Sequence, residues 1–226
     1  MATNHLDFIR NSGTIAFKGR KDILSNFYPC PIYYKNKWFN CVEQAYQWEK
    51  ANFHNCAPIA DLILVLNDPY VQKLATRPID CNHEWMTTRV HVMKNILKCK
   101  LDCVLDYKQL LLHSKGVIVE AVVNEGFWSS GLSKENVFLR KRGDWPGQNM
   151  LGKLHMELRD ELHSVRNLLL AQTPRMVLNC SSQGIENISV NTNSREVTVY
   201  AKSESQAYAF TDNWMIPRIV VRVLIR

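Results

Sequence analysis

The sequence FNCVEQAYQWEKA, residues 39–51, decides what the rest of this chain is expected to build. It contains neither proline nor glycine, and Asn40 is a good N-cap residue, so a helix is predicted to begin there. On that helix Glu43, Gln47 and Lys50 share one face. Glu43 and Lys50 then lie within about 20° of each other around the axis and about 10 Å apart along it. This arrangement suits two groups that flank a bound sugar, and a solvent-exposed polar face is the alternative.

The composition is that of a globular protein with an anionic partner. Of the 226 residues, 46% are hydrophobic and 22% are charged, and the length allows one large domain or a domain with an appendage. The net charge of +7 favours phosphate, pyrophosphate or nucleic acid as a partner. The seven cysteines are scattered, so neither a disulfide framework nor a zinc or other metal site is predicted.

The segments that would direct a protein to a membrane are not recognised in this sequence. Residues 1–10, MATNHLDFIR, lack the apolar centre of a secretory signal, and the longest aliphatic run, Leu62–Leu66, is too short to span a bilayer. A cytoplasmic protein with possible access to the nucleus, and without a membrane partner, is therefore expected. Residues 1–13 are predicted to be a flexible lead-in.

Two short strands are predicted before the first helix, at Thr14–Phe17 and Ile32–Trp38. The second is bounded by Pro31 and by a polar turn, Lys35-Asn36-Lys37. The segment between them, Leu24–Pro31, contains prolines that forbid helix and restrict their neighbours to extended conformations. A loop of this kind is suited to holding Asn26 and Phe27 at a site.

Helical periodicity dominates the middle of the chain. Met86, Val90, Met93 and Leu97 recur at helical spacing and are expected in the core, while Trp85 falls in the first turn of the same helix. Helices are predicted over Pro58–Leu66, Pro69–Ala75 with Asp68 as its cap, His83–Leu101, Cys103–His113 and Met150–Gln172, with a buried strand at Val117–Val123.

The composition changes after Pro174, which is expected to end the last helix. Residues 173–226 are rich in Asn, Ser and Thr, with strand-like runs at Glu196–Ala201 and Arg218–Ile225. The predicted fold class is therefore α+β: a mainly helical domain over residues 14–172 with a small β-sheet, and a C-terminal β-rich extension over residues 173–226.

Two features of the third quarter of the chain point to an anion. Basic residues follow the aromatic segment Phe127–Gly131 and could attract phosphate or simply be solvated; these are Lys134, Arg140, Lys141 and Arg142. The helix predicted from Met150 would present free N–H groups, although Asn149 could equally serve only as its N-cap.

Five segments taken together resemble the YbiA-like NADAR family in order and spacing. They are LSNFYPCPI from Leu24, CVEQAYQWEKA from Cys41, Trp85 followed by Met93, VEAVVNEGFWSSG from Val119 and DWPGQNMLGKLHMELRDEL from Asp144. The resemblance covers Thr14 to Gln172 and implies a mainly helical α+β domain of YbiA-like fold. It also implies cleavage of an N-glycosidic bond, either in a ribosylamino intermediate of riboflavin synthesis or between ADP-ribose and guanine.

The resemblance assigns the expected site. The family's Glu-x6-Lys helix matches Glu43 and Lys50, its tryptophan matches Trp85, and its Ser-Asn-Phe loop matches Ser25 to Phe27. Its Gly-x-Asn-x-Leu-Gly turn matches the segment that contains Asn149 and Gly152, and Gln47, Trp128 and Gly131 complete the expected substrate-binding residues. In two places the chain departs from the family: Glu125 stands where the family commonly has Asp, and Ser129 where it has Gly.

The chemistry of a ribose C1–N bond explains why such residues are needed. Cleavage passes through an oxocarbenium-like state, which a carboxylate stabilises while an acid protonates the leaving nitrogen. Glu43 is expected to stabilise the cation or to activate water, and Glu125 to replace the family's Asp. Lys50 has three open roles: holding phosphate, donating a proton, or forming an imine with C1.

The remaining expectations concern the ligand. Trp85, Trp128 and Phe27 are expected to stack on a base, and the turn at residues 149–152 to bind pyrophosphate. No cofactor is expected, and the partner is an ADP-ribose-containing small molecule or ADP-ribosylated nucleic acid. Two further hypotheses are a binding module that holds ADP-ribose without cleaving it and an interaction protein that works through its C-terminal extension.

Overall fold

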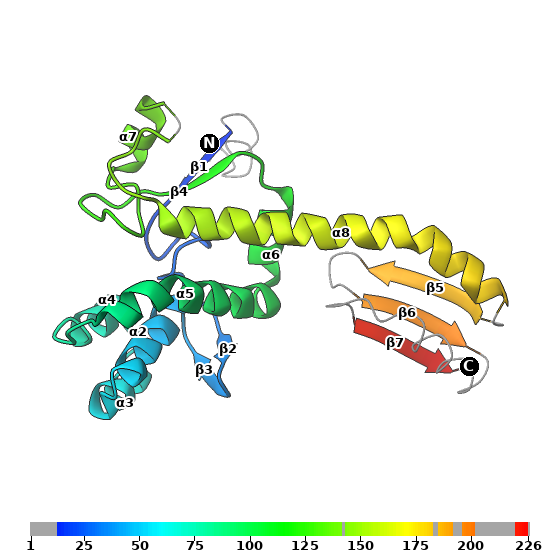
Figure 1. The fold of residues 1–226 in the computed structure, drawn as a ribbon, viewed down its shortest axis with the longest axis horizontal. Helices are drawn as coiled ribbons and strands as arrows, with labels where there is room; N and C mark the ends of the chain where they lie inside the picture. Colours follow the sequence, from blue (N-terminus) through cyan, green and yellow to red (C-terminus); the bar gives the residue numbers. More distant parts are fainter. Residues whose placement is uncertain (1–12, 142, 183–184, 192–195, 202–219, 226) are drawn as a thin grey trace. The chain divides into compact units, whose positions relative to one another are not determined.

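The computed structural model describes residues 13–141, 143–182, 185–191, 196–201 and 220–225 (Figure 1). The predicted lead-in, apart from Gly13, and the basic residue Arg142 therefore lie outside the described residues. The chain divides into two compact units, one up to Arg159 and one from Asp160 onward, and each is described separately.

A parallel pair of buried strands forms one side of the first unit. β1 (Thr14–Phe17) pairs with β4 (Val117–Glu120) in a register that runs from Thr14 opposite Val117 to Phe17 opposite Glu120. β1 has the predicted bounds. β4 is shorter than the predicted Val117–Val123, because the Glu120 carbonyl accepts a hydrogen bond from the Ser130 backbone and the chain turns away. Parallel pairing requires a long crossover, which the helices between the two strands provide.

The strand predicted over Ile32–Trp38 is a hairpin: the predicted polar turn at Lys35–Lys37 divides it, and its second strand was not predicted. β2 (Ile32–Tyr34) pairs antiparallel with β3 (Lys37–Phe39). The two residues between them, Lys35 and Asn36, have φ values of 46° and 62°. Positive φ at both central positions is the requirement of a tight hairpin turn, and asparagine tolerates it better than most residues.

The crossover consists of helices that mostly match the prediction. The helix expected from Asn40 begins one residue later, because Cys41 is its N-cap and Cys41 Sγ accepts from the Gln44 backbone. Asp68 caps its helix as predicted, with Oδ1 accepting from the Tyr70 backbone. The observed bounds are α2 (Val42–Phe53), α3 (Ala57–Val65), α4 (Pro69–Ala75), α5 (His83–Cys103), α6 (Leu105–His113) and, after β4, α7 (Lys134–Leu139).

The core of the first unit includes the apolar face of α5. Met93 and Leu97 are buried as predicted, together with Val92 and Ile96. Met86 is 44% exposed, so its predicted place in the core is wrong. It lies at the start of α5, where the helix borders a pocket.

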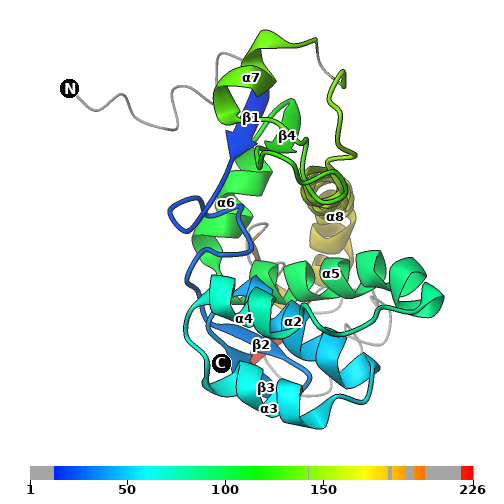
Figure 2. The same ribbon diagram turned by 90° about the vertical axis from the view of Figure 1, so that its left-hand side faces the viewer.

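Two groups of elements frame that pocket. Figures 1 and 2 both show β1, β4 and α7 together at one end of the unit, and α2, α3, α4 and the β2–β3 hairpin together at the other. Small residues pack the first group, where Ala16, Val119, Ala121 and Val137 form a buried cluster.

The last helix, α8 (Met150–Ser182), belongs to both units and is longer than predicted. Pro174 does not end it. A proline removes one backbone hydrogen bond, and a long helix keeps the bonds of the turns on either side. In the second unit, β5 (Ile185–Asn191), β6 (Glu196–Ala201) and β7 (Val220–Ile225) form a sheet in that order.

Two of these three strands were predicted. β6 has the predicted bounds, and β5 was not predicted. β7 was predicted from Arg218, and residues 218 and 219 lie outside the described residues. β5 and β6 are antiparallel, whereas β6 and β7 are parallel. In the part of the chain that the structure describes, no helix combines the length and the apolar character needed to cross a membrane.

Candidate active site

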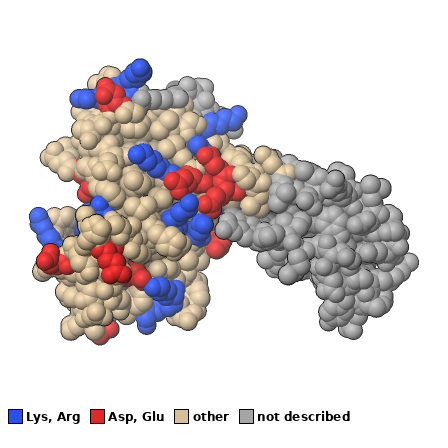
Figure 3. All heavy atoms as spheres, in the orientation of Figure 1, with Lys and Arg blue, Asp and Glu red and all other residues tan. Residues whose placement is uncertain are grey.

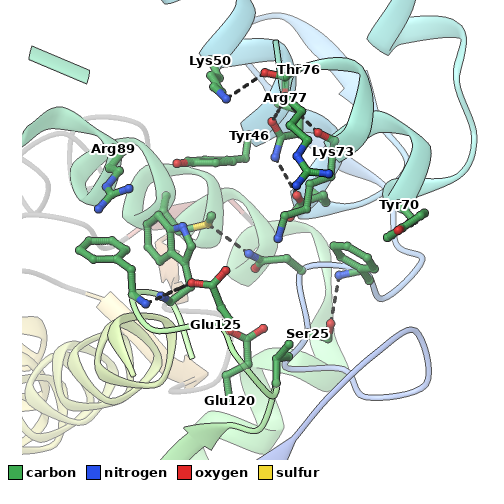
Figure 4. Close-up of a pocket in the computed structure, with 18 of the residues that line it drawn as sticks. Ser25, Tyr46, Lys50, Tyr70, Lys73, Thr76, Arg77, Arg89, Glu120 and Glu125 are labelled. Carbon is green, nitrogen blue, oxygen red and sulfur yellow. Dashed lines mark hydrogen bonds between the residues drawn. The ribbon is translucent and has the colours of Figure 1, made fainter. Parts of the chain in front are cut away.

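A pocket of about 780 Å³ lies in the first unit, within the size range of small-molecule sites (Figure 4). It brings together segments far apart in the sequence: the loop after β1, helices α2, α4 and α5, and the chain after β4. The predicted site residues that line it are Asn26, Phe27, Glu43, Gln47, Lys50, Trp85, Glu125 and Trp128.

Glu43 and Lys50 lie on the same wall of the pocket, as their helical spacing predicted. Glu43 is 5% exposed, and its Oε1 accepts a hydrogen bond from Gln47 Nε2 at 2.7 Å. The Thr76 hydroxyl donates to Gln47 Oε1 and fixes the orientation of that amide. Burial raises the pKa of Glu43, an effect that the positive charge of Lys73 opposes. The Lys50 ammonium group donates to the Thr76 carbonyl at 3.0 Å.

Asn26 presents an unsatisfied acceptor at the pocket. Its side chain is 7% exposed, and Oδ1 is buried with no hydrogen-bond partner among the described residues. Nδ2 has only a weak contact of 3.6 Å to Met93 Sδ. The Asn26 carbonyl accepts from the Glu43 backbone at 3.0 Å, so the loop and the start of α2 are joined. A buried oxygen without a donor is costly, and a ligand N–H or O–H would satisfy it.

A buried lysine supports the loop that carries Asn26. Lys100 is fully buried, and its Nζ donates to the carbonyls of Ile23 at 2.5 Å and Ser25 at 3.1 Å. The ammonium group also lies 4.7 Å from the centre of the Tyr107 ring. Burial lowers the pKa of Lys100 to about 8.

His155 completes this support from α8. Its Nε2 is 2.9 Å from the Leu24 carbonyl oxygen, and its Nδ1 is 2.7 Å from the Tyr107 hydroxyl. A carbonyl only accepts, so Nε2 carries the proton and Nδ1 accepts from Tyr107. Burial lowers the pKa of His155 to about 3, which keeps the ring neutral. The carbonyl groups of residues 23–25 thus accept hydrogen bonds from a network of buried polar side chains.

Aromatic side chains and one arginine form another wall. Trp85 is 2% exposed and packs against Tyr46 and Phe53, so it offers a ligand little more than an edge. Trp128 is half-buried and meets Tyr46 edge-on at 5.7 Å. The Arg89 guanidinium group lies 3.5 Å from the centre of the Phe127 ring.

Five charged residues that line the pocket were not predicted, namely Lys18, Lys73, Arg77, Arg89 and Glu120. Glu120, at the end of β4, points into it near Glu125, while Lys73 and Arg77 enter from α4 and the residues after it (Figure 4). The signal for Glu120 was a carboxylate that ends a buried β-branched run. Lys73 and Arg77 had no such signal, because basic residues on or just after a short helix give the same sequence pattern whether they face a pocket or water.

Burial and two neighbouring carboxylates change the pKa of Glu120. Burial, followed by the charges of Glu43 and Glu125, raises the pKa of Glu120 to about 8, while Lys73 lowers it. Its backbone is fixed by Asn149, whose Oδ1 accepts from the Glu120 N–H at 2.9 Å.

Three residues predicted to bind substrate, namely Gly131, Asn149 and Gly152, do not line the pocket. The Asn149 amide takes the place of a strand partner for β4: besides the Glu120 contact, its Nδ2 donates to the Ile118 carbonyl at 2.9 Å. A Cβ on Gly152 would lie 2.5 Å from that Nδ2, so glycine permits the close approach. Gly131 has a φ of 77° and supports a turn.

The expected pyrophosphate site at the start of α8 is not available. The backbone N–H groups of Asn149, Met150 and Leu151 donate to the carbonyls of Ser129, Phe127 and Trp128. These N–H groups are already used, so the helix end offers them to no anion. Of the basic residues predicted to attract phosphate, Lys134, Arg140 and Lys141 do not line the pocket, and Lys134 pairs with Asp22 at 2.6 Å.

The two departures from the family pattern have different consequences. Glu125 lines the pocket, and its Oε1 accepts from the backbone N–H groups of Phe127 at 3.1 Å and Trp128 at 3.3 Å. Ser129 is fully buried, where its hydroxyl donates to the Glu120 carbonyl and accepts from the Val122 N–H, each at 2.7 Å. Ser129 therefore supports the strand end that carries Glu120.

Basic and acidic side chains are interspersed on one face of the described residues. On the face drawn in Figure 3, the described basic and acidic side chains lie next to one another rather than in separate areas. Among the described residues no group of three His, Cys, Asp or Glu side chains is placed to hold a metal ion.

Comparison with known proteins gives a family and a fold. The sequence profile of the NADAR domain matches residues 16–163. The solution structure of Escherichia coli YbiA superimposes with a TM-score of 0.55 and 25% identity, covering 70% of this chain and 88% of YbiA. The predicted YbiA-like α+β fold is therefore confirmed.

Curated relatives match over shorter stretches. Protein irg-1 of Caenorhabditis elegans is 29% identical over 129 residues, which is 55% of this chain and 61% of irg-1. The riboflavin biosynthesis protein PYRR of Arabidopsis thaliana is 34% identical over 89 residues, which is 39% of this chain and 13% of PYRR. N-glycosidase R617 of Acanthamoeba polyphaga mimivirus is 37% identical over 54 residues, which is 24% of this chain and 32% of R617. The matches thus span less than two thirds of each relative.

Proposed function

Because this chain belongs to the NADAR domain family, we propose that it is an N-glycosidase that hydrolyses the ribose C1–N bond of an ADP-ribosyl N-glycoside. Its leading substrate is ADP-ribose attached to guanine, free or in nucleic acid. The observation that carries the proposal is the pocket itself, in which carboxyl groups and basic side chains meet between aromatic walls. A mimiviral relative named N-glycosidase supports the reaction class.

The carboxyl groups suit the transition state of this reaction. Positive charge develops at C1 as the bond to nitrogen breaks, and Glu43, held in place by Gln47, is positioned to stabilise it. A water molecule then adds to C1. We assign Lys50 to a phosphate oxygen rather than to a reaction with C1, and the hydrogen bond that holds its ammonium group on the Thr76 carbonyl supports this assignment.

The basic side chains favour a substrate that carries phosphate. Lys50, Lys73, Arg77 and Arg89 all line the pocket, and the latter two can pair with phosphate oxygens through two N–H groups at once. The diphosphate of ADP-ribose would meet Lys73 and Arg77, which reach into the pocket from one side (Figure 4). The half-buried Phe27 and Trp128 are available to stack on a base.

The test is release of ADP-ribose from an oligonucleotide that carries ADP-ribosylated guanine, followed by chromatography. Wild-type protein is expected to release it, and Glu43→Gln to bind the oligonucleotide but lose turnover. The matched control is Glu157→Gln, since Glu157 pairs with Lys94 and does not line the pocket. If wild-type protein releases no ADP-ribose even at stoichiometric concentration, the proposal fails.

The second candidate reaction is hydrolysis of a phosphorylated ribosylamino-pyrimidine of riboflavin synthesis. Two relatives, from Arabidopsis thaliana and Zea mays, are named riboflavin biosynthesis protein PYRR, which favours this substrate. It needs the same carboxyl groups but only one phosphate site. Comparing kcat/KM for the two substrates decides between them, and tight ADP-ribose binding without turnover of either would leave a binding module.

A further inference from the structure

Among the carboxyl groups of the pocket, Glu120 differs in how it is held. Glu43 accepts an N–H from Gln47, and Glu125 accepts two backbone N–H groups. Among the described residues, no donor hydrogen-bonds to the Glu120 carboxyl group. The first two side chains are arranged as acceptors, whereas Glu120 has the freedom to act as a donor.

The surroundings of Glu120 favour its neutral form. The charges that act on it come from Glu43 on α2, Glu125 in the loop after β4 and Lys73 on α4, all of which line the same pocket. Burial is the largest cause, and the two carboxylates act in the same direction against the one ammonium group. A carboxyl group that keeps its proton beside an ionised one is the arrangement that divides acid and base roles between two similar side chains.

The backbone of Glu120 is fixed more firmly than its side chain. Its N–H donates to Asn149 Oδ1, and its carbonyl accepts from the hydroxyls of Ser129 and Ser130 and from the Ser130 N–H. A carboxyl group on so rigid a support keeps a defined position in the pocket.

We propose that Glu120 is the acid that protonates the leaving nitrogen, an inference that rests on the proposed glycosidase function. The Glu120 carboxyl group gives its proton to the leaving nitrogen as the C1–N bond breaks, and the electron pair of that bond stays on nitrogen. Glu43 stabilises the cation at C1. Water then adds to C1 and gives a proton to Glu43, and exchange with solvent restores both carboxyl groups.

This assignment removes proton donation from the open roles of Lys50. It also gives Ser129, one of the departures from the family pattern, a positioning role, because Ser129 holds the Glu120 carbonyl. Burial and carboxylate neighbours raise the pKa of Glu120 to about 8, which keeps it protonated at neutral pH.

The experiment compares kcat, KM and pH profiles for wild type, Glu120→Gln and Glu135→Gln, with the ADP-ribosylated guanine oligonucleotide as substrate. Glu135 is the control, because it is exposed on α7 and does not line the pocket. For Glu120→Gln we expect kcat to fall about 10²- to 10⁴-fold with KM changed less than threefold. The wild-type fall in activity above about pH 8 should be absent from the residual activity.

A second variant separates proton donation from simple support. In Glu120→Ala, kcat should fall far less for an ADP-ribosyl substrate whose leaving group is already cationic, such as the nicotinamide of NAD, because that nitrogen needs no proton, whereas Glu43→Ala should lose kcat for both substrates. Glu120→Gln within tenfold of wild type, or with the alkaline fall retained, overturns the assignment while leaving the glycosidase proposal intact. An inactive wild-type protein overturns both.

Discussion

Substituting Gly152 by alanine tests whether α8 holds the end of β4 as the structure indicates. In an ordinary helix this change stabilises by up to about 1 kcal/mol. Here the new Cβ would lie 2.5 and 2.6 Å from the two terminal atoms of the Asn149 amide and closer still to the Ile118 carbonyl oxygen. The helix must move, and Asn149 then loses its hydrogen bonds to Glu120 and Ile118.

The relative sizes of these effects decide whether Gly152→Ala raises or lowers the free energy of unfolding. Crowding of this kind costs about 1–3 kcal/mol, and two hydrogen bonds add about 2 kcal/mol. Subtracting the helix gain leaves a net loss of about 2–4 kcal/mol in the free energy of unfolding, or roughly 5–15 °C in Tm. Thermal unfolding followed by tryptophan fluorescence measures it. Gly126→Ala is the control, because nothing lies within 4 Å of its added Cβ. A Gly152→Ala protein as stable as wild type would refute the close approach.

Three further changes probe the loop, the charges and the buried histidine. Lys100→Met should raise KM at least tenfold, because the carbonyls of residues 23 and 25 lose their donor. Lys100→Arg should reverse less than half of that increase in KM, which steady-state kinetics will measure. Lys73→Met should raise KM for ADP-ribosyl substrates about tenfold, because the diphosphate loses a cationic partner. It should lower kcat less than Glu43→Gln does, since Glu43 remains but loses the charge that opposes its raised pKa. The folded-state pKa of His155 lies below its unfolded value, so the unfolded state binds more protons between pH 6.5 and 3. Stability should therefore fall by about 3–5 kcal/mol as pH drops through that window, and denaturant titrations should show a smaller fall for His155→Gln.

Much of the fold follows from local sequence. β1 and α4 have the predicted bounds, because β-branched residues, Asp68 and Pro69 mark them within a few positions. The polar turn at Lys35–Lys37 was predicted, but the β2–β3 hairpin was not, because this turn lacks glycine and depends on positive φ at Lys35 and Asn36.

The candidate site was predictable where one helix sets the spacing. Glu43, Gln47 and Lys50 share a wall because the helical period places them there. Glu120 and Lys73 meet only after β4 and α4 pack at the same pocket, and no local pattern encodes that meeting. Asn149 shows the reverse error: its motif indicated a binding residue, whereas its amide is used to hold a strand.

The most direct measurement is a crystal structure of the Glu43→Gln protein with an ADP-ribosylated guanine nucleoside. We expect ribose C1 to lie within about 4 Å of the side chains at positions 43 and 120, with a polar ligand atom on Asn26 Oδ1 and the diphosphate at Lys73. A ligand bound elsewhere, or one whose C1 faces solvent with both side chains out of reach, would contradict this expectation.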